Sequence, residues 1–302
     1  MIQVKSVSSA IAFAKLESGS VRLNKLGPGV EIWDIDISAG LAQEELDKVK
    51  EVFFEHGLIF IMDQNISEPD HIAFAEHFGE ININRFFQAH PEYSQVALVT
   101  KEPDQVNNIG GDWHTDHSYD ELPALGSVLA ARQLPPTGGD TWFVSMYDAL
   151  EELSVGLRDS LKQMRAVHSA HHVFGTQASA AAEPGARISN PESADALSEP
   201  VHPVIIKHPL SGKEALYINP GFTLRFEGWT EEESRPLLEF LYSQATKSEN
   251  ITRFKWRPGS IAFWDNRATW HNAQNDYDGF RREMHRITIE GCELEPADVR
   301  CP

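Results

Sequence analysis

Apolar and polar positions in the first third of the chain predict alternating strands and helices. Two short strands are expected over 20–36, where apolar and polar residues alternate. Apolar residues at helical spacing then predict a helix over about 41–55, and the uninterrupted apolar run 58–62 predicts a buried strand. A second amphipathic helix is expected over about 67–79. This opening is typical of a structural scaffold.

Beyond residue 95 the pattern changes to short apolar runs separated by turns that contain glycine or proline. Such a series is typical of an antiparallel sandwich or barrel. The expected strands are Gln95–Thr100, Gly126–Gln133, Thr141–Val144, Ala166–His171, Val201–Lys207, Ala215–Asn219, Thr252–Trp256, Ile261–Trp264 and Arg282–Glu290. One more helix is expected at about 231–246, because Thr230 and Glu233 form a capping-box pattern. Pro236 would kink this helix or move its start.

The segment 175–200 interrupts the pattern of short strands. It is rich in Ala, Ser, Gly, Pro and Glu, and it has no periodicity. We interpret it as a long loop within a single domain that covers residues 1–302. Long loops inside compact domains are either functional lids or flexible insertions, and the sequence leaves both open.

Composition and charge restrict the class of protein. With 41% hydrophobic and 24% charged residues the chain is ordinary for a soluble globular protein. A formal net charge of -19 argues against nucleic acid and anionic membrane surfaces as partners. Its apolar runs are too short to span a bilayer, the N-terminal residues lack the pattern of a secretory signal, and Cys292 and Cys301 provide no disulfide framework. We therefore expect a cytoplasmic protein.

The segment 110–117 carries the most specific chemical signal. It places His114 and Asp116 two positions apart, and in an extended strand such residues face the same side and reach one metal ion. His271 is the candidate third ligand, and two histidines with one carboxylate form the facial triad of non-haem Fe(II) oxygenases. With 13 histidines and 45 acidic residues, a lone His-x-Asp pair arises readily as an ordinary hydrogen-bonded pair. The interpretation therefore depends on the motifs further along the chain.

These motifs, taken in order, resemble one enzyme family. They are Trp113-His114-Thr115-Asp116, Gly138-Gly139-Asp140-Thr141, Trp264-Asp265-Asn266-Arg267 with His271, and then Arg282 and Arg286. In type, order and spacing they resemble the taurine dioxygenase-like (TauD/TfdA) family of Fe(II)- and 2-oxoglutarate-dependent dioxygenases, over about residues 29–291. The resemblance implies a mainly β fold with flanking helices, the double-stranded β-helix (jelly roll, clavaminate synthase-like). It also implies a homo-oligomer, either a dimer or a tetramer.

The resemblance also implies how the cofactor and cosubstrate bind. His114, Asp116 and His271 would hold Fe(II) as the catalytic centre, where 2-oxoglutarate and O2 react to give succinate and CO2. Arg282, eleven residues after His271, would bind the far carboxylate of 2-oxoglutarate together with Thr141. Related halogenases replace the carboxylate ligand with a small residue, so the presence of Asp116 argues against halogenation.

Arg286 is the candidate for binding the substrate. It lies four residues after Arg282, so in a strand both side chains would face the same way. The family uses this position to bind the anionic group of a small organic acid, a sulfonate or carboxylate, or else a sulfate ester or phosphonate. Asn84 and Phe87 stand where taurine-cleaving members carry His and Tyr, and His117 is polar where those members are apolar. We assign these three residues to substrate contacts, while a hydrogen-bonded His117 and a core Phe87 stay open, and we expect a substrate other than taurine.

Two other functions remain open at this stage. A non-catalytic protein would hold the metal and the keto acid without turnover. A metal-dependent hydrolase would use the same three ligands to activate water, but its mechanism does not need Arg282 and Thr141. The remaining histidines and most tryptophans are interpreted as structural, including His168, His171, His172, His285, Trp142, Trp229 and Trp256.

Overall fold

The computed structural model describes residues 16–18, 21–177, 192–193, 197 and 199–298. The expected lid or flexible loop at 175–200 therefore lies mostly outside the described residues, as does Cys301.

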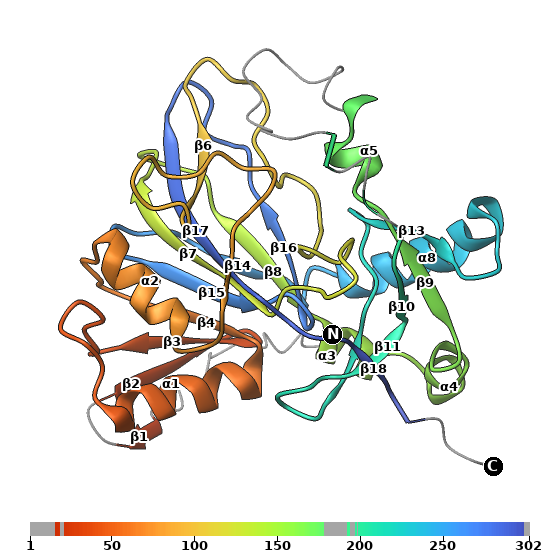
Figure 1. Cartoon of the computed structure of the whole chain (residues 1–302). Coiled ribbons are helices and arrows are strands. Elements are labelled where there is room, and N and C mark those ends of the chain that lie inside the picture. The colour runs from red at the N-terminus through yellow and green to blue at the C-terminus, as the bar shows by residue number, and fades with distance from the viewer. Residues whose placement is uncertain (1–15, 19–20, 178–191, 194–196, 198, 299–302) are drawn as a thin grey trace, which may run out of the picture.

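A large sheet forms the centre of the molecule (Figure 1). Among the described residues it has nine strands, in the order β1-β2-β3-β4-β15-β7-β17-β5, and β6 also pairs with β17. The β3–β4 pair is parallel, whereas the other neighbouring strands are antiparallel. The strands are β1 (Leu16–Ser18), β2 (Val21–Leu26), β3 (Gly29–Trp33), β4 (Leu58–Ile61), β5 (Ile81–Asn82), β6 (Ala97–Lys101), β7 (Gly126–Gln133), β15 (Ile261–Asp265) and β17 (Arg282–Ile289).

A second, smaller sheet faces the large one. It consists of β14 (Thr252–Phe254), β8 (Thr141–Ser145) and β16 (Thr269–Ala273), in that order. Side chains of both sheets form one buried apolar core, to which β4 contributes Phe60, β15 contributes Trp264 and β8 contributes Phe143. The rings of Phe60 and Phe254 stack across the two sheets with their centroids 4.0 Å apart. The two sheets thus form a β-sandwich, so the protein is mainly β, as expected.

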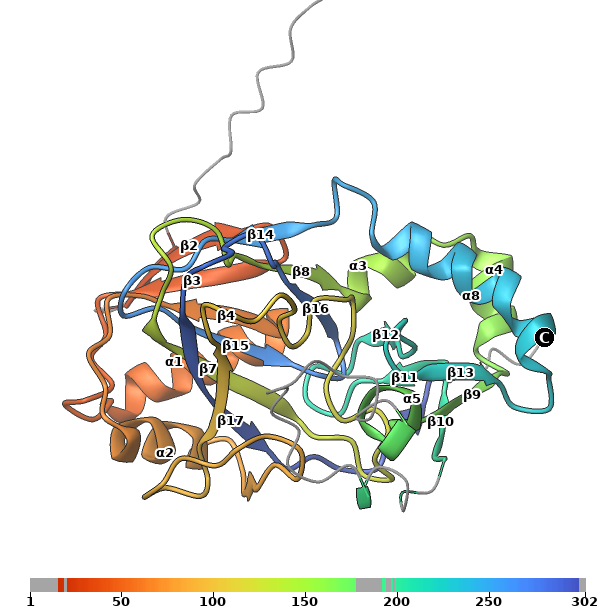
Figure 2. The ribbon, with the colours of Figure 1, turned by 90° about the horizontal axis from the view of Figure 1, so that it is seen from above.

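Two helices cover the other face of the large sheet, α1 (Gln43–His56) and α2 (Glu68–Glu76) (Figures 1 and 2). On β15, Phe263 points to these helices and Trp264 points to the small sheet, because successive strand residues face opposite sides. The ring of Phe53 on α1 stacks on Phe263 with a centroid distance of 3.7 Å. Both helices form where the hydrophobic spacing predicts them.

A further group of helices and short strands packs beside the sandwich, on the right in Figure 1. Two small sheets have the strand orders β10-β9-β13 and β12-β11-β18. The elements are β9 (Arg165–His168), β10 (Val201–Pro203), β11 (Ile205–Lys207), β12 (Glu214–Leu216), β13 (Thr223–Phe226), β18 (Glu295–Pro296), α3 (Met146–Glu151), α4 (Val155–Leu161), α5 (His171–Phe174) and α8 (Glu231–Ala245). Their buried apolar residues form a core of their own, which includes Trp270 of β16. No helix within the described part of the chain is long and apolar enough to cross a membrane.

Most of the predicted elements are confirmed, and the differences have local causes. The strand expected at 201–207 is divided into β10 and β11, because the chain changes sheets at Val204. Helices α3 and α4 were not predicted, although Ser145 and Ser154 cap their first turns. The strand expected at 166–171 ends at His168, and His171 begins the unpredicted helix α5. Helix α8 has the predicted bounds, begins with the predicted capping box and continues through Pro236.

A buried ion pair holds the turn between β15 and β16. Arg267 Nε and Nη2 donate to the two carboxylate oxygens of Asp265 at 2.9 and 2.7 Å, and His208 Nε2 lies 3.0 Å from Asp265 Oδ2. Burial alone would raise the pKa of Asp265. The charges of Arg267 and His208 together outweigh this effect and hold the pKa below its ordinary range. Since β16 carries His271, this ion pair helps to fix the position of a predicted metal ligand.

Replacing Asp265 should strongly destabilise the protein. Asp265→Asn removes the negative charge that compensates the buried Arg267, and a broken buried pair costs about 3–5 kcal/mol. The free energy of unfolding in urea measures this effect. Asp34→Asn is the matched control, because it removes the partner of Arg22 at an exposed site with the same 2.9 Å contact, where a loss of about 0.2–1 kcal/mol is expected. Equal losses in the two variants would contradict the role of the buried pair.

Candidate active site

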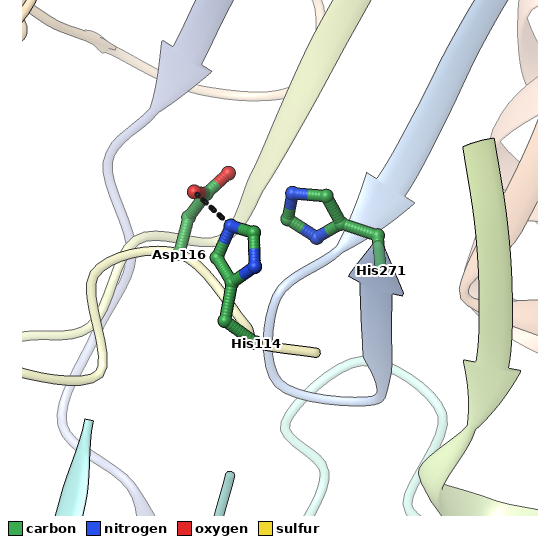
Figure 3. A group of neighbouring side chains, drawn as sticks. All are labelled: His114, Asp116 and His271. Carbon is green, nitrogen blue, oxygen red and sulfur yellow. Dashed lines mark ion pairs between the residues drawn. The ribbon is translucent and has the colours of Figure 1, made fainter. Parts of the chain in front are cut away.

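The three predicted metal ligands converge in the structure (Figure 3). The ligand atoms of His114, Asp116 and His271 all lie within 4.8 Å of one another, and they form the one such group found among the described residues. His114 Nε2 is 3.7 Å from Asp116 Oδ1. The arrangement brings two imidazoles and one carboxylate together, which is the donor set of a facial triad.

Backbone hydrogen bonds bring the two histidines together. His114 N donates to His271 O at 3.1 Å, and His271 N donates to His114 O at 2.8 Å, which leaves the ring centroids 4.1 Å apart. The extended strand expected around His114 and Asp116 is wrong. His114 forms an isolated bridge, and Asp116 begins a turn that continues through His117, whose φ is 61°. The carboxylate therefore approaches the imidazole through a turn and not through the alternation of a strand.

Asp116 is held by two neighbours that the sequence did not connect with it. Ser127 Oγ on β7 donates to Asp116 Oδ2 at 2.9 Å, and Arg286 Nη1 on β17 lies 3.1 and 3.2 Å from the two carboxylate oxygens. Burial alone would raise the pKa of Asp116. Arg286 and the nearby histidines together outweigh this effect and hold the pKa below its ordinary range. Burial also lowers the pKa of His271. An ionised carboxylate and a neutral imidazole are the forms that bind metal.

A cavity of about 970 Å³ opens in front of these ligands. This volume is at the upper end for small-molecule sites. The structure brings seven of the predicted site residues together around it. These are Phe87, His114, Asp116, Thr141, His271, Arg282 and Arg286. Asn84 and His117 do not line it.

The two arginines present unpaired donors at this cavity. Nε and Nη2 of Arg282 and Nε of Arg286 are buried and have no hydrogen-bond partner. Both residues lie on β17 and line the same cavity, so the strand spacing predicted their common direction correctly. Burial lowers the pKa of Arg282, while Tyr277 and Asp140 oppose this shift. Because buried polar groups are rarely left unpaired, these donors suit an anionic ligand.

Asn84 and His117 form hydrogen bonds within the loops and are not among the residues that line the cavity. Asn84 Oδ1 accepts hydrogen bonds from the backbone N–H groups of Phe86 and Phe87 at 2.9 and 3.0 Å, and His117 Nδ1 is 2.9 Å from Asp120 Oδ2. The loop that they hold presents Phe87, whose ring centroid is 4.4 Å from the Arg286 guanidinium carbon. Direct contact of Asn84 or His117 with a substrate stays a prediction.

An aromatic wall, defined here as Phe87, Phe174 and Phe222, lines one side of the cavity. The Phe174 and Phe222 rings are 5.9 Å apart, and Phe222 is 6.1 Å from the His114 ring. Phe174 and Phe222 were not predicted, because they follow no motif and come from α5 and from the loop before β13. His172 also lines the cavity, although we interpreted it from the sequence as structural.

Gly221 limits the position of His114. A Cβ atom at residue 221 would lie 2.7 Å from His114 Cβ, closer than two such carbon atoms approach. Gly221→Ala should therefore displace the imidazole and weaken binding of Mn(II), measured by calorimetry, by about 10–100-fold, as for other changes that reorient metal ligands. Gly156→Ala is the control, because a Cβ at residue 156 meets no atom within 4 Å. Unchanged Mn(II) affinity in folded Gly221→Ala would contradict the role of Gly221 in positioning His114.

Comparison with known proteins agrees with this geometry. The family described as "Taurine catabolism dioxygenase TauD, TfdA family" matches residues 22–288. An alpha-ketoglutarate-dependent 2,4-dichlorophenoxyacetate dioxygenase of Cupriavidus pinatubonensis is 31% identical over 293 residues, covering 89% of this chain and 97% of the relative. An alkylsulfatase of Acinetobacter baylyi is 30% identical over 273 residues, covering 87% of this chain and 82% of the relative. The crystal structure of a taurine dioxygenase from Burkholderia xenovorans is similar with a TM-score of 0.76, at 30% identity and 93% coverage of each chain. This chain therefore belongs to the TauD/TfdA family of alpha-ketoglutarate-dependent (2-oxoglutarate-dependent) dioxygenases.

Proposed function

We propose that this dioxygenase uses Fe(II) and 2-oxoglutarate to hydroxylate an organic anion that has an apolar body. The observation that carries the proposal is a single cavity that holds a His-Asp-His donor set and two arginines with buried, unpaired donors. The two facing sheets around this cavity support a double-stranded β-helix (jelly roll). Neither a metal-dependent hydrolase nor a non-catalytic binding protein accounts as well for family membership together with this arrangement.

The donor set fits Fe(II). His114, Asp116 and His271 supply three donors close together, and a metal with only three protein ligands would keep positions open for a chelating keto acid and for O2. When bound, Fe(II) and 2-oxoglutarate supply the oxidising chemistry, in which O2 and 2-oxoglutarate are converted to succinate and CO2. The protein's own part is to hold these groups in place and to direct the substrate.

Arg282 and Thr141 suit the far carboxylate of 2-oxoglutarate. Arg282 comes from the large sheet and Thr141 from the small one, so a carboxylate between them would join the two sheets. The guanidinium offers two buried donors without partners, and such a planar group binds a carboxylate through two parallel hydrogen bonds. Burial of both residues makes these bonds stronger than at an exposed site.

Arg286 suits the anionic group of the substrate. One of its nitrogen atoms contacts Asp116, which places the guanidinium beside the proposed metal, while Nε has no partner. The aromatic wall next to it suits an apolar body. Among the described lining residues the carboxylates are Asp116, assigned to the metal, and the exposed Asp112, so the wall offers little to the ammonium group of taurine. Relatives named for alkyl sulfates and for 2,4-dichlorophenoxyacetate support the apolar body.

The remaining expectations are kept as proposals. They are the single domain over 1–302, a homo-oligomer, either dimer or tetramer, and a cytoplasmic location without nucleic-acid or membrane partners.

Anaerobic addition of Fe(II) and then 2-oxoglutarate should produce a visible metal-to-ligand charge-transfer band. Asp116→Ala should abolish the band, because it removes the carboxylate ligand. Arg282→Ala should raise the Kd for 2-oxoglutarate by about 10–100-fold, since a hydrogen bond to a charged group contributes about 1.5–3 kcal/mol. Arg281→Ala, a change at a neighbouring arginine that pairs with Glu102, should leave both properties unchanged. A folded wild-type protein without the band would refute the oxygenase proposal.

The enzyme should form succinate from 2-oxoglutarate faster with hexanesulfonate as substrate than with taurine, because the alkyl chain of hexanesulfonate fits the aromatic wall. Arg286→Gln should lower kcat/KM for hexanesulfonate by about 10–100-fold through loss of a charged hydrogen bond. At saturating Fe(II), this variant should bind 2-oxoglutarate with a nearly unchanged Kd. Hexanoate and hexyl sulfate in the same assay report which anionic group is preferred. Faster turnover of taurine than of hexanesulfonate would contradict the proposed apolar body of the substrate. If Arg286→Gln weakened 2-oxoglutarate binding as much as it lowered kcat/KM for hexanesulfonate, the separate roles of the two arginines would be contradicted.

A further inference from the structure

Trp256 contacts both residues of the proposed carboxylate site. It lies just after β14, is buried in the core between the two sheets, and is not among the residues that line the cavity. Its indole nitrogen Nε1 donates to Thr141 Oγ1 at 2.9 Å. Its ring centroid is 5.8 Å from the guanidinium carbon of Arg282. One side chain outside the cavity thus touches the two residues expected to hold the far end of 2-oxoglutarate.

The hydrogen bond from Trp256 determines how Thr141 can act. An indole N–H can only donate, so the hydroxyl oxygen of Thr141 is the acceptor in this bond. The proton of the same hydroxyl is then left to donate to another group. Thr141 lines the cavity, and an ionised carboxylate can only accept. The bond therefore prepares the threonine as a donor of the kind that a carboxylate requires.

The position of Arg282 is limited on more than one side. The face of an indole ring attracts a cation within about 6 Å of its centroid, and the guanidinium meets this condition at Trp256. A Cβ atom at Gly139, where φ is 71°, would lie 3.3 Å from Arg282 Cδ and Nε. Arg282 Nε and Nη2 have no hydrogen-bond partner. The packing contacts with Trp256 and Gly139 therefore limit the orientation of the guanidinium before a ligand arrives.

We propose that Trp256 is a positioning residue for 2-oxoglutarate, which it serves through Thr141 and Arg282 without touching the ligand. The inference rests on the proposed function, because it assumes that these two residues bind the far carboxylate. It also extends the interpretation of Trp256 from the sequence, where this residue had a structural role alone. In the folded protein Trp256 packs in the core and also orients the ligand site.

Trp256→Phe tests this proposal, because it keeps an aromatic ring in the core and removes the N–H donor. With Mn(II) in place of Fe(II), so that no turnover occurs, calorimetry should show 2-oxoglutarate binding about three- to tenfold more weakly, the loss expected for one neutral hydrogen bond. Pyruvate is also a keto acid but lacks the far carboxylate, so its Kd should not change. Trp142→Phe is the matched control, because Trp142 follows Thr141 on β8, points to the opposite face of the strand and does not line the cavity.

A double substitution separates this role from packing. In a Thr141→Val background, Trp256→Phe should cause little further loss of 2-oxoglutarate affinity, because its effect passes through the removed hydroxyl. Equal weakening for 2-oxoglutarate and pyruvate, or a full additional loss in the double variant, would overturn the proposal. Wild-type protein that binds pyruvate as tightly as 2-oxoglutarate would instead refute the carboxylate site itself.

A measurement on the wild-type protein covers the case in which Trp256→Phe does not fold. In ¹⁵N-labelled protein with Zn(II), the indole N–H resonance of Trp256 should shift when 2-oxoglutarate is added and stay in place when pyruvate is added. The shift is expected because the carboxylate polarises the Thr141 hydroxyl that accepts the indole N–H. An unmoved resonance at saturating 2-oxoglutarate would overturn the proposal.

Discussion

The pair of backbone hydrogen bonds between His114 and His271 is the contact on which the active site depends. It joins a loop with little regular structure to β16, a strand that pairs with β8 along its length. The buried Asp265–Arg267 pair holds the turn before β16. The loop that carries His114 therefore takes its position from the rigid sandwich, which is how two imidazoles far apart in sequence stay close enough to share a metal ion.

The distribution of charge around the cavity differs from that of the whole chain. The protein has a formal net charge of -19, yet two buried arginines line the cavity, and Arg286 has its carboxylate partner in the proposed ligand Asp116. Arg282 keeps two donors without partners. Buried unpaired donors destabilise a folded protein by themselves, so their presence is best explained by an anion that completes their hydrogen bonds. The same argument accounts for an acidic protein that acts on acidic small molecules.

The cavity lies where three parts of the fold meet. β17 of the large sheet provides the arginines, and β8 and β16 of the small sheet provide Thr141 and His271. Loops and α5 provide the other two predicted metal ligands and the aromatic wall. This division separates the proposed 2-oxoglutarate site from the wall that would contact the apolar body of a substrate. The proposed 2-oxoglutarate position and the predicted ligand His271 depend on strands, whereas the aromatic wall depends on loop and α5 residues that can change without disturbing the sheets.

The sequence by itself determined what local geometry and motif spacing encode. Short apolar runs between turns placed most of the strands, helical spacing placed α1 and α2, and a capping box placed α8. A separation of four residues in one strand predicted a common direction for Arg282 and Arg286. Only the tertiary structure decided that His114 and Asp116 meet through a turn, that Asn84 and His117 do not line the cavity, and that Phe174 does. It also decided that Ser127 and Trp256 hold site residues. Each of these contacts joins segments that are distant in sequence or depends on a single turn, and the period of a strand or helix contains no information about either.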